Sequence, residues 1–360
     1  MNPSFPSITF PNHWTLVTGL YPEAHGIVAN EFYDPELKEQ FIHKKPAISQ
    51  QPKWWGGEPI WTTAASQGKK SAVIMWPGSA VPSHLPTYLV DYIRGTTAID
   101  KMDTTLNWLD LPIESRPQMI AVYIPQIDQK GHGGGPDGPQ MNRNLTQVDE
   151  AISHLMDGLK KRNLDALVDI VIVSDHGMAP TDKSRLIFYD DILSTESLRY
   201  LREREAWPML NLRPVENAPS HIVDQVYEEL HSYTQQVPEA HFRVYRREDV
   251  PARFHYSSTL RIAPIVTIPD VGYSFTTHDE FDPDTAPCYR PRGIHGYDNM
   301  APEMRAIFMA KGPNVMRDYA PGTVLAPFFN IEVYGFLTRL LALDAAPNNG
   351  TLHGQFISVK

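Results

Sequence analysis

The sequence has very little cysteine: Cys288 is the only one among its 360 residues. An intrachain disulfide, a four-thiolate zinc site and Cys-x-x-Cys redox chemistry are therefore excluded, and a bound metal would have to be held by histidines and carboxylates. The chain also lacks an excess of positive charge. Its 32 basic and 42 acidic residues give a net charge of −10, which argues against a protein that coats nucleic acid.

The chain lacks a hydrophobic run of the length that a membrane span requires. A span needs about 20 apolar residues, whereas the longest apolar segment, residues 166–173, is interrupted by Asp169. The first residues, MNPSFPSITF, have neither the basic start nor the apolar run of a signal peptide. Two glycosylation sequons, at Asn144 and Asn349, are weak indications of secretion. We therefore expect no membrane segment and no export signal within this chain.

The sequence does contain the pattern of an α/β protein. Four apolar, β-branched segments are typical of strands buried on both faces, and they span residues 71–76, 119–127, 166–173 and 305–310. Between the second and third segments, apolar residues from Met141 to Leu159 recur at helical spacing and predict a crossover helix. A strand, a helix and a strand in this order favour a mostly parallel sheet with helices on both faces.

The alternation of strands and helices is interrupted in the second half of the chain. Residues 201–292 combine a helix-like segment, 222–230, with the strand-like string RIAPIVTIPDVGYSF. We predict that they form an inserted subdomain within a single domain of residues 1–360. A further helix, predicted over residues 330–343, would cover one face of the sheet.

Acidic residues and histidines follow the predicted strands, at the sheet edge where open α/β sheets bind ligands. Asp128 and His132 follow the second strand, Asp175 and His176 follow the third, and His295 lies in a later string, GIHGYDN. A mixed set of nitrogen and oxygen ligands suits Zn²⁺ better than Ca²⁺ or Mg²⁺. The pattern therefore predicts a zinc site, although each residue alone is more often a turn cap, a core residue or a surface residue.

Thr9 precedes Pro11 at the predicted start of a helix that runs toward Gly19. The backbone N–H groups of a helix N-terminus attract phosphate, and zinc would lower the pKa of a nearby hydroxyl. Under those conditions the threonine becomes a nucleophile for phosphorus. Without them Thr9 is a simple helix N-cap, and the residues alone leave both roles open.

Six strings, taken in order and at their separations, resemble the nucleotide pyrophosphatase/phosphodiesterase family of the alkaline phosphatase superfamily: TFPNH, GLYPEAHGI, WPGS, SDHGM, GIHGYDN and APNNGT. The resemblance extends from Thr9 to about Gly354. It implies an alkaline-phosphatase-like α/β/α sandwich with a mostly parallel central sheet and an inserted subdomain. It also implies hydrolysis of phosphodiester or pyrophosphate bonds in nucleotides through a covalent threonine intermediate, with release of a nucleoside 5′-monophosphate.

The same resemblance implies roles for the residues at matching positions. Thr9 is similar to the nucleophile, and Asn30 is similar to the asparagine that hydrogen-bonds a nonbridging phosphoryl oxygen. Phe10 and Tyr92 are similar to the two rings that sandwich the nucleobase, although Tyr92 is equally well a loop aromatic. Two Zn²⁺ ions are implied, one held by Asp128, His132 and His295 and the other by Asp175, His176 and Thr9.

One part of the family pattern is missing from this sequence. Family members carry, upstream of the nucleophile, a strand that ends in an aspartate and completes the second zinc site. Only eight residues, none of them acidic, precede Thr9. We therefore expect this chain to be the C-terminal part of a longer protein whose upstream portion holds a secretion signal or a membrane anchor. A metal site short of ligands would bind weakly and leave this chain with weak or no activity by itself.

The sequence leaves alternative functions open within and outside this family. Some relatives cleave choline-type lipid phosphodiesters, and other members of the superfamily hydrolyse phosphate monoesters or sulfate esters. Asn30 favours diesters over monoesters. A catalytically impaired or non-catalytic ligand-binding protein is the alternative from a different class. The preferred nucleotide and the oligomeric state are not specified by the residues.

Overall fold

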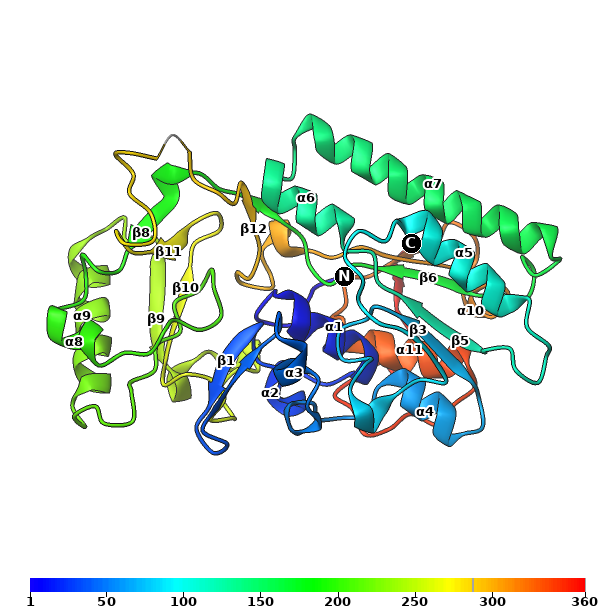
Figure 1. Ribbon diagram of the computed structural model, residues 1–360, viewed down its shortest axis with the longest axis horizontal. Helices are drawn as coiled ribbons and strands as arrows, with labels where there is room; N and C mark the ends of the chain where they lie inside the picture. The colour runs from blue at the N-terminus through cyan, green and yellow to red at the C-terminus, as the bar shows by residue number, and fades with distance from the viewer. Residues whose placement is uncertain (287, 360) are drawn as a thin grey trace.

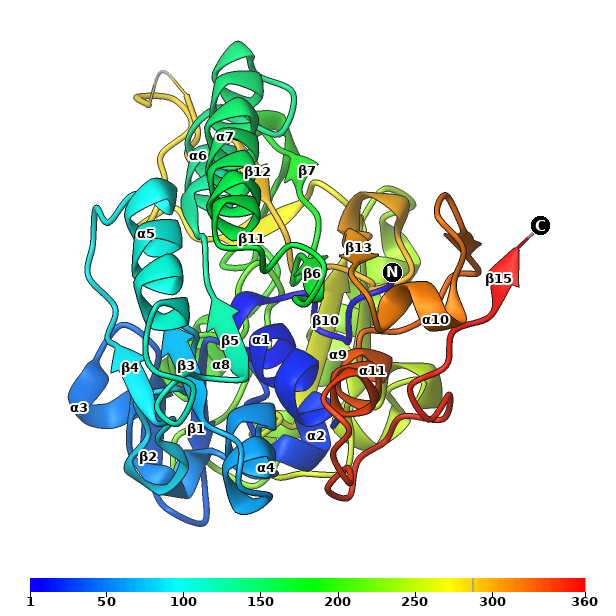
Figure 2. The same ribbon diagram turned by 90° about the vertical axis from the view of Figure 1, so that its right-hand side faces the viewer.

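The structure is a computed structural model that describes residues 1–286 and 288–359, and its larger part is layered (Figure 1). The strands of the middle layer are β3 (Ser71–Ile74), β4 (Tyr88–Val90), β5 (Met119–Val122), β6 (Ile170–Val173) and β13 (Phe308–Lys311). The helices that cover them are α5 (Ala98–Leu109) and α7 (Pro139–Lys161) on one side, and α1 (Thr9–Thr18), α4 (Ile60–Ser66) and α11 (Glu332–Leu340) on the other. Figure 2 shows β3 and β5 between α5 and α1. The predicted α/β fold with helices on both faces of the strands is therefore confirmed.

The five strands of the middle layer form two separate hydrogen-bonded groups. β3 lies between β4 and β5 in a parallel sheet, with Val73 opposite both Leu89 and Ala121. β6 pairs with β13 instead, in antiparallel orientation, with Val173 opposite Phe308. β5 and β6 are thus joined through their crossover helix and not by a shared ladder. The four residues of β6 are only partly buried, and those of β13 alternate between half-buried and exposed. The prediction that both faces of these two strands are covered is therefore wrong.

The second predicted strand extends less far than the apolar run suggests. β5 ends at Val122, and residues Gln126–Gly134 form helix α6. Pro125 stands between them as the helix N-cap residue, and proline cannot donate a hydrogen bond to a strand ladder. The predicted strand over residues 119–127 is therefore wrong in its last part. The consequence is that Asp128 and His132 lie four residues apart on one helix, and so on the same helix face.

Residues of the predicted inserted subdomain form their own elements at one end of the molecule, on the left in Figure 1. These elements are α9 (Ile222–Gln236), β9 (Phe242–Arg246), β10 (Ile265–Pro269) and β11 (Ser274–Thr276). They enclose an apolar cluster that includes Leu230, Phe242 and Phe275. β11 pairs with β8 (Leu186–Phe188), which precedes residue 201. The predicted helix is longer than expected, and the division of the chain at residues 201 and 292 stays a prediction.

Shorter elements complete the described fold. The helices are α2 (Pro22–His25), α3 (Pro46–Ser49), α8 (Thr195–Arg199) and α10 (Val315–Asp318). The strands are β1 (Glu31–Asp34), β2 (Glu39–Ile42), β7 (Ala179–Pro180), β12 (Gly293–Ile294), β14 (Val324–Leu325) and β15 (Ser358–Val359). No helix of the described residues combines the length and the apolar character needed to cross a membrane.

An aromatic core holds α1 in place. Trp14 is fully buried, and its ring packs edge-to-face against Trp55 at 4.8 Å and Trp61 at 5.7 Å between centroids. Its indole Nε1 donates a hydrogen bond of 2.7 Å to the backbone carbonyl of Gly56. Because the polar atom of this buried ring is satisfied, the whole side chain stabilises the position of the helix.

Trp14→Ala is expected to lower the free energy of unfolding by about 3–5 kcal/mol, because it leaves a large cavity in a closely packed aromatic cluster. Denaturant unfolding followed by circular dichroism measures this change. Leu145→Ala is the control, because Leu145 on α7 is 49% exposed and its truncation should cost little. A Trp14→Ala protein as stable as the control would contradict the role of this core.

Candidate active site

Helix α1 presents Thr9 at its N-terminus. The helix begins at Thr9, and the N-cap residue is Ile8, whose side chain accepts no hydrogen bond. The prediction of a helix start at Thr9 is therefore confirmed, whereas the alternative of a simple N-cap threonine is wrong. The Thr9 hydroxyl instead lies 3.2 Å from Nε2 of His176, a residue 167 positions further along the chain. The first-turn N–H groups of a helix have no intrahelical partner and favour anions nearby.

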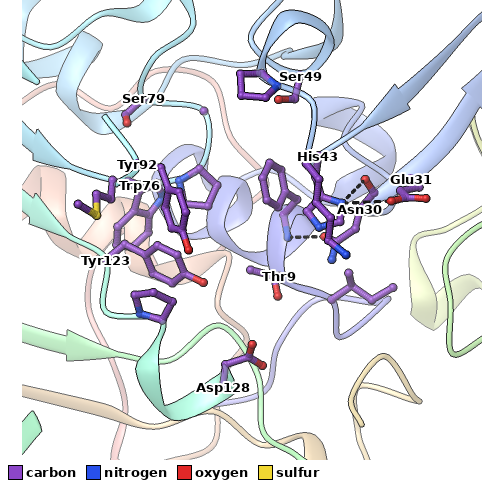
Figure 3. A pocket seen from close by; sticks show the side chains of 18 of the residues that line it. Thr9, Asn30, Glu31, His43, Ser49, Trp76, Ser79, Tyr92, Tyr123 and Asp128 are labelled. Atoms are coloured by element: carbon purple, nitrogen blue, oxygen red, sulfur yellow. Dashed lines mark hydrogen bonds and ion pairs between the residues drawn. The ribbon is translucent and has the colours of Figure 1, made fainter. Parts of the chain in front are cut away.

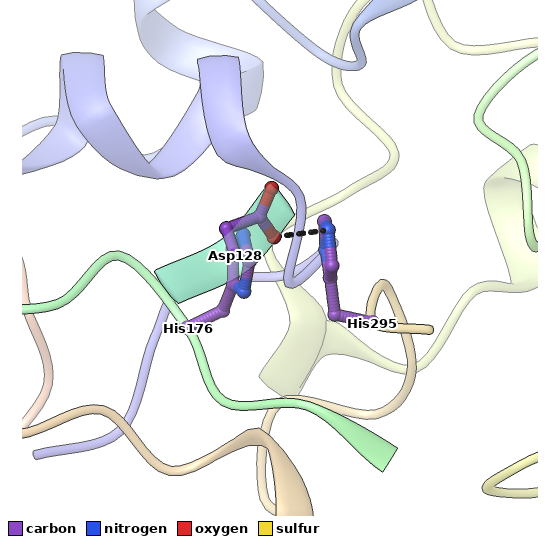
Figure 4. A group of neighbouring side chains, drawn as sticks. All are labelled: Asp128, His176 and His295. Carbon is purple, nitrogen blue, oxygen red and sulfur yellow. Dashed lines mark ion pairs between the residues drawn. The ribbon is translucent and has the colours of Figure 1, made fainter. Parts of the chain in front are cut away.

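A carboxylate and three histidines converge beside Thr9 from distant parts of the chain. Asp128 and His132 come from α6, His176 follows β6, and His295 follows β12. Ligand atoms of Asp128, His176 and His295 all lie within 4.8 Å of one another. Figure 4 shows these three side chains. Nε2 of His132 and Nε2 of His295 are 3.1 Å apart, and each is 3.4 Å from Oδ1 of Asp128.

Backbone carbonyls orient the three imidazoles. Nδ1 of His132 is 2.8 Å from the Gly293 carbonyl, Nδ1 of His176 is 2.9 Å from the Gly177 carbonyl, and Nδ1 of His295 is 2.9 Å from the Ser7 carbonyl. A carbonyl only accepts, so each Nδ1 donates, and the neutral ring then has a bare lone pair on Nε2. This is the arrangement in which histidines bind metal, because the second nitrogen fixes the tautomer and the ring orientation.

The central carboxylate has an oxygen that the protein leaves unsatisfied. Oδ1 of Asp128 is buried and makes no hydrogen bond within the described part of the chain. Such an atom is costly to bury unless a ligand completes it. Together with the inward lone pairs of the imidazoles, it gives a nitrogen and oxygen donor set that fits a divalent transition-metal ion such as zinc.

The protonation of the site follows from burial and from these contacts. Burial opposes ionisation of Asp128, but the adjacent His132 and His295 outweigh it and hold the pKa of that carboxyl below its usual range. Burial alone would lower the pKa of His176, whereas the Asp175 carboxylate beside it raises the pKa to about 9. The carboxylates of Asp128 and Asp175 therefore place negative charge beside the imidazoles, and this charge favours a bound cation.

Asp175 contacts two histidines, one of which the sequence interpretation missed. Its Oδ2 lies 3.1 Å from Nε2 of His176 and 3.2 Å from Nδ1 of His13. Nδ1 of His13 is also 2.9 Å from the Thr9 carbonyl, and the buried ring packs edge-to-face on Trp76 and Tyr123. His13 is therefore a link between the helix that carries Thr9 and the loop that carries Asp175. The string TFPNH contains it, but the sequence offered no contact partner for it.

Asn30 lies next to the first turn of α1. Its side-chain Oδ1 accepts a hydrogen bond of 2.9 Å from the backbone N–H of Phe10, as drawn in Figure 3. With the oxygen fixed in this way, the Nδ2 amino group keeps its two donors for another acceptor. An amide donor beside the Thr9 hydroxyl could donate to an anionic oxygen bound at the helix N-terminus.

A cavity of about 720 Å³ opens above these groups. Thr9, Asn30, Asp128, His132 and His295 are among the residues that line it. So are both aromatic residues predicted for the nucleobase: Phe10, which packs on Phe41 and Trp55, and Tyr92, which is 55% exposed. Figure 3 shows Tyr92 with Trp76 and Tyr123 across the cavity from Asn30.

The predicted site residues are therefore brought together by the fold. The set Asp128, His132 and His295 forms one cluster, and the set Thr9, Asp175 and His176 forms a second beside it. The stacked rings of His176 and His295, with centroids 3.5 Å apart, join the two sets. His176 also forms one group of possible metal ligands with Asp128 and His295. A residue predicted for the second ion therefore lies within reach of the first ion's ligands. The role of each residue stays a prediction.

A helix N-terminus that presents a threonine to a carboxylate–imidazole cluster, at one edge of a layered α/β fold, fits a hydrolase of the alkaline-phosphatase-like class. The model of the family described as type I phosphodiesterase/nucleotide pyrophosphatase matches residues 1–298. The chain belongs to this family. The expectation from the sequence motifs is thus confirmed at the level of the family.

Similar proteins come from distant organisms. The chain is 46% identical over 98% of its length to an uncharacterized pyrophosphatase/phosphodiesterase of Schizosaccharomyces pombe, and it covers 72% of that protein. It is 37% identical, again over 98% of its length, to ectonucleotide pyrophosphatase/phosphodiesterase family member 3 of Bos taurus. The chain spans 39% of the length of this bovine protein.

The fold is similar to that of a solved relative. Murine ectonucleotide pyrophosphatase/phosphodiesterase 5, in an inactive threonine-to-alanine form in complex with AMP, superimposes with a TM-score of 0.83 at 30% identity. The match covers 98% of this chain and 88% of the murine chain. The alkaline-phosphatase-like fold expected from the sequence is thereby confirmed.

Proposed function

We propose that this protein hydrolyses phosphodiester or pyrophosphate bonds in nucleotides through a covalent intermediate on Thr9 and releases a nucleoside 5′-monophosphate. The observation that carries the proposal is the position of the Thr9 hydroxyl. It lies at a helix N-terminus, 3.2 Å from Nε2 of His176, within the lining of a cavity that also contains Asp128, His132 and His295. Family membership supports the same reaction class.

Two Zn²⁺ ions are the cofactors that we propose. Asp128, His132 and His295 would hold one ion, and Asp175, His176 and Thr9 would contribute to the other. The buried, unsatisfied Oδ1 of Asp128 and the inward Nε2 atoms support this assignment. When bound, such ions lower the pKa of a hydroxyl nucleophile and neutralise charge on phosphoryl oxygens.

The residues of the chain have separate tasks in the proposed reaction. The Thr9 oxygen attacks phosphorus, so that an Oγ1–P bond forms as the bond to the leaving oxygen breaks. The backbone N–H of Thr9 and the Nδ2 group of Asn30 donate to the nonbridging oxygens, whose charge increases in the transition state. Water then cleaves the Oγ1–P bond and regenerates the threonine. The hydroxyl proton leaves to solvent in the first step and is restored in the second.

Phe10 and Tyr92 would bind the base of the nucleotide between their rings. Phe10 follows Thr9 directly and is held against Phe41 and Trp55, so its ring is pre-positioned beside the nucleophile. The Tyr92 side chain is held more loosely, by a hydrogen bond of 3.4 Å that Nε2 of Gln129 donates to its hydroxyl. The complex of the murine relative with AMP supports a nucleotide as the ligand class.

A comparison of two chromogenic esters tests this function. The p-nitrophenyl ester of thymidine 5′-monophosphate should be hydrolysed with a kcat/KM at least about tenfold higher than p-nitrophenyl phosphocholine, because stacking of one base on aromatic rings is worth roughly 1–3 kcal/mol. The absorbance of the released p-nitrophenolate follows both reactions. A preference for the choline ester would instead identify a lipid-type phosphodiesterase.

Tyr92→Leu provides the matched variant for this comparison. Because the Tyr92 side chain is 55% exposed, its replacement should leave the fold intact. The variant is expected to lose the preference for the thymidine ester and to keep hydrolysis of the choline ester. A protein that binds AMP in calorimetry but cleaves neither ester would show a ligand-binding role and contradict the proposed hydrolysis.

A further inference from the structure

A loop from the left-hand part of Figure 1 lines the same cavity as the proposed nucleophile. Arg204, Ala206 and Trp207 belong to its lining, together with His132 and His295. These three residues lie at the start of the predicted inserted subdomain and away in sequence from the proposed base-binding rings. The cavity therefore has a part that the nucleophile, the proposed metal ligands and the base slot do not account for.

A buried ion pair fixes the base of this loop. Nε of Arg213 donates to Oε1 of Glu205 at 2.9 Å, and the two side chains are 8% and 4% exposed. The backbone of Glu205 exchanges two hydrogen bonds with Asn211, at 2.9 and 3.2 Å. The chain between these two residues is thereby held as a closed turn, with Arg204 immediately before it.

The tip of the turn is packed directly onto the catalytic region. A Cβ atom on Gly296 would lie 2.6 Å from Cδ of Pro208 and 3.2 Å from Cγ1 of Ile8, so these groups are in close contact. Gly296 follows the proposed metal ligand His295, and Ile8 precedes Thr9. Ala206, in the turn itself, has a φ of +60°, a conformation that costs energy for a residue with a Cβ. The surrounding contacts therefore hold a strained turn against both halves of the site.

The side chains of Arg204 and Trp207 could together bind a ligand that carries both a negative charge and an aromatic ring. The Arg204 guanidinium is largely buried, with 20% of its side chain exposed, and pairs with Glu280 through Nη1. A guanidinium has five N–H donors in a planar fork, so this pair leaves donors for a phosphate. Trp207 is half-buried and offers an indole on the same wall.

We propose that Arg204 and Trp207 form a leaving-group subsite that favours anionic, phosphate-bearing leaving groups, with the indole as a stacking surface for a second base. This inference rests on the proposed function, because a leaving group exists only if the protein cleaves a phosphodiester or pyrophosphate bond. The subsite shares its cavity with His132 and His295 and with Phe10, beside which the base of the released monophosphate is proposed to lie. The two side chains would then discriminate between a phosphate-bearing leaving group and an uncharged one.

Arg204→Gln tests the subsite with two substrates that differ in their leaving groups. ATP loses pyrophosphate as its leaving group, whereas the p-nitrophenyl ester of thymidine 5′-monophosphate loses a phenol. The ratio of kcat/KM for ATP to kcat/KM for the ester is expected to fall about tenfold, the effect of one charge-assisted hydrogen bond that is partly exposed to solvent. Trp207→Leu should lower the ratio of kcat/KM for diadenosine tetraphosphate to kcat/KM for ATP. Only the first of these substrates has a second base that could stack on the indole.

Arg202→Gln is the matched control. Arg202 is two residues away and lies 3.8 Å from Glu216 with its guanidinium over the ring of Tyr33, and it is not among the residues that line the cavity. This variant should leave the ratio unchanged. An equal loss on both substrates in Arg204→Gln, or no loss, would overturn the subsite. Failure of the unmodified protein, tested together with the upstream portion expected from the family pattern, to cleave either substrate would contradict the proposed function instead.

Binding of pyrophosphate, the product of ATP cleavage, distinguishes a wrong subsite from a wrong proposed function. Inorganic pyrophosphate needs no turnover to bind, so calorimetry with Mg²⁺-free pyrophosphate reports on the subsite even in an inactive protein. Weaker binding by Arg204→Gln than by the unmodified protein supports the subsite. Equal dissociation constants for the two proteins, with both folded as judged by thermal unfolding, would refute it.

Discussion

Thr9→Ala is expected to lower kcat/KM for the p-nitrophenyl ester of thymidine 5′-monophosphate by a factor of about 1,000 or more, the size seen when a covalent nucleophile is removed. The methyl group of alanine preserves the first turn of α1, because Ile8 and not Thr9 is the N-cap residue. The contact of 3.2 Å between Oγ1 and Nε2 of His176 is the only described side-chain hydrogen bond of Thr9 that is lost. The loss should therefore fall on the reaction and not on the fold.

Two further variants separate the hydroxyl from its surroundings. Thr9→Ser keeps an oxygen at the same position and should retain measurable hydrolysis. Thr104→Ala is the matched control, because its hydroxyl lies on α5 and donates to the Asp100 carbonyl of its own helix at 2.9 Å. Intact-mass analysis of the unmodified protein after rapid quenching should detect a nucleotidyl adduct on Thr9. Full activity of Thr9→Ala would remove the nucleophile from the proposed mechanism.

The sequence was sufficient to predict which residues meet at the site, because the residue types that bind metals stand at the strand ends that the fold brings together. Asp128 and Asp175 follow two strands joined by a crossover helix, and such strand ends meet at one edge of an open sheet. The start of α1 at Thr9 was readable from Pro11 and Gly19, since proline fits a first helical turn and glycine ends a helix in the left-handed conformation. The glycine-flanked string GIHGYDN suggested His295 as a ligand, and the family motif assigned it to the same ion as the α6 residues.

Other features were beyond the sequence because they depend on contacts between distant segments. The apolar run through Ile127 is typical of one strand, and only the three-dimensional path shows that a helix begins directly after Pro125. The apolar residues of β6 predict burial on both faces, yet burial depends on which strand lies alongside. His13 has an unremarkable place within α1, and its contact with Asp175 arises from tertiary packing. The turn that carries Arg204 and Trp207 reaches the site only through its packing on Gly296.

The second large effect is expected at the centre of the proposed metal site. Asp128→Asn removes one negative charge and keeps the shape of the side chain. Because Oδ1 of Asp128 is buried, unsatisfied and 3.4 Å from Nε2 of both His132 and His295, this oxygen is the one on which the cluster converges. Elemental analysis should show the loss of about one equivalent of zinc per chain, and kcat/KM should fall about 100-fold or more.

Asp103→Asn is the control that makes this result specific. Asp103 also pairs with a histidine, with Oδ1 2.6 Å from Nε2 of His154, but the two side chains are 53% and 43% exposed. An exposed pair in water has little affinity for a cation and contributes little to stability, so this variant should keep both the zinc content and the activity of the unmodified protein. If Asp128→Asn retained the same zinc content as Asp103→Asn, the ions would be held elsewhere and the metal assignment would be wrong. Since zinc content is measured without turnover, this outcome decides the metal site separately from the role of Thr9.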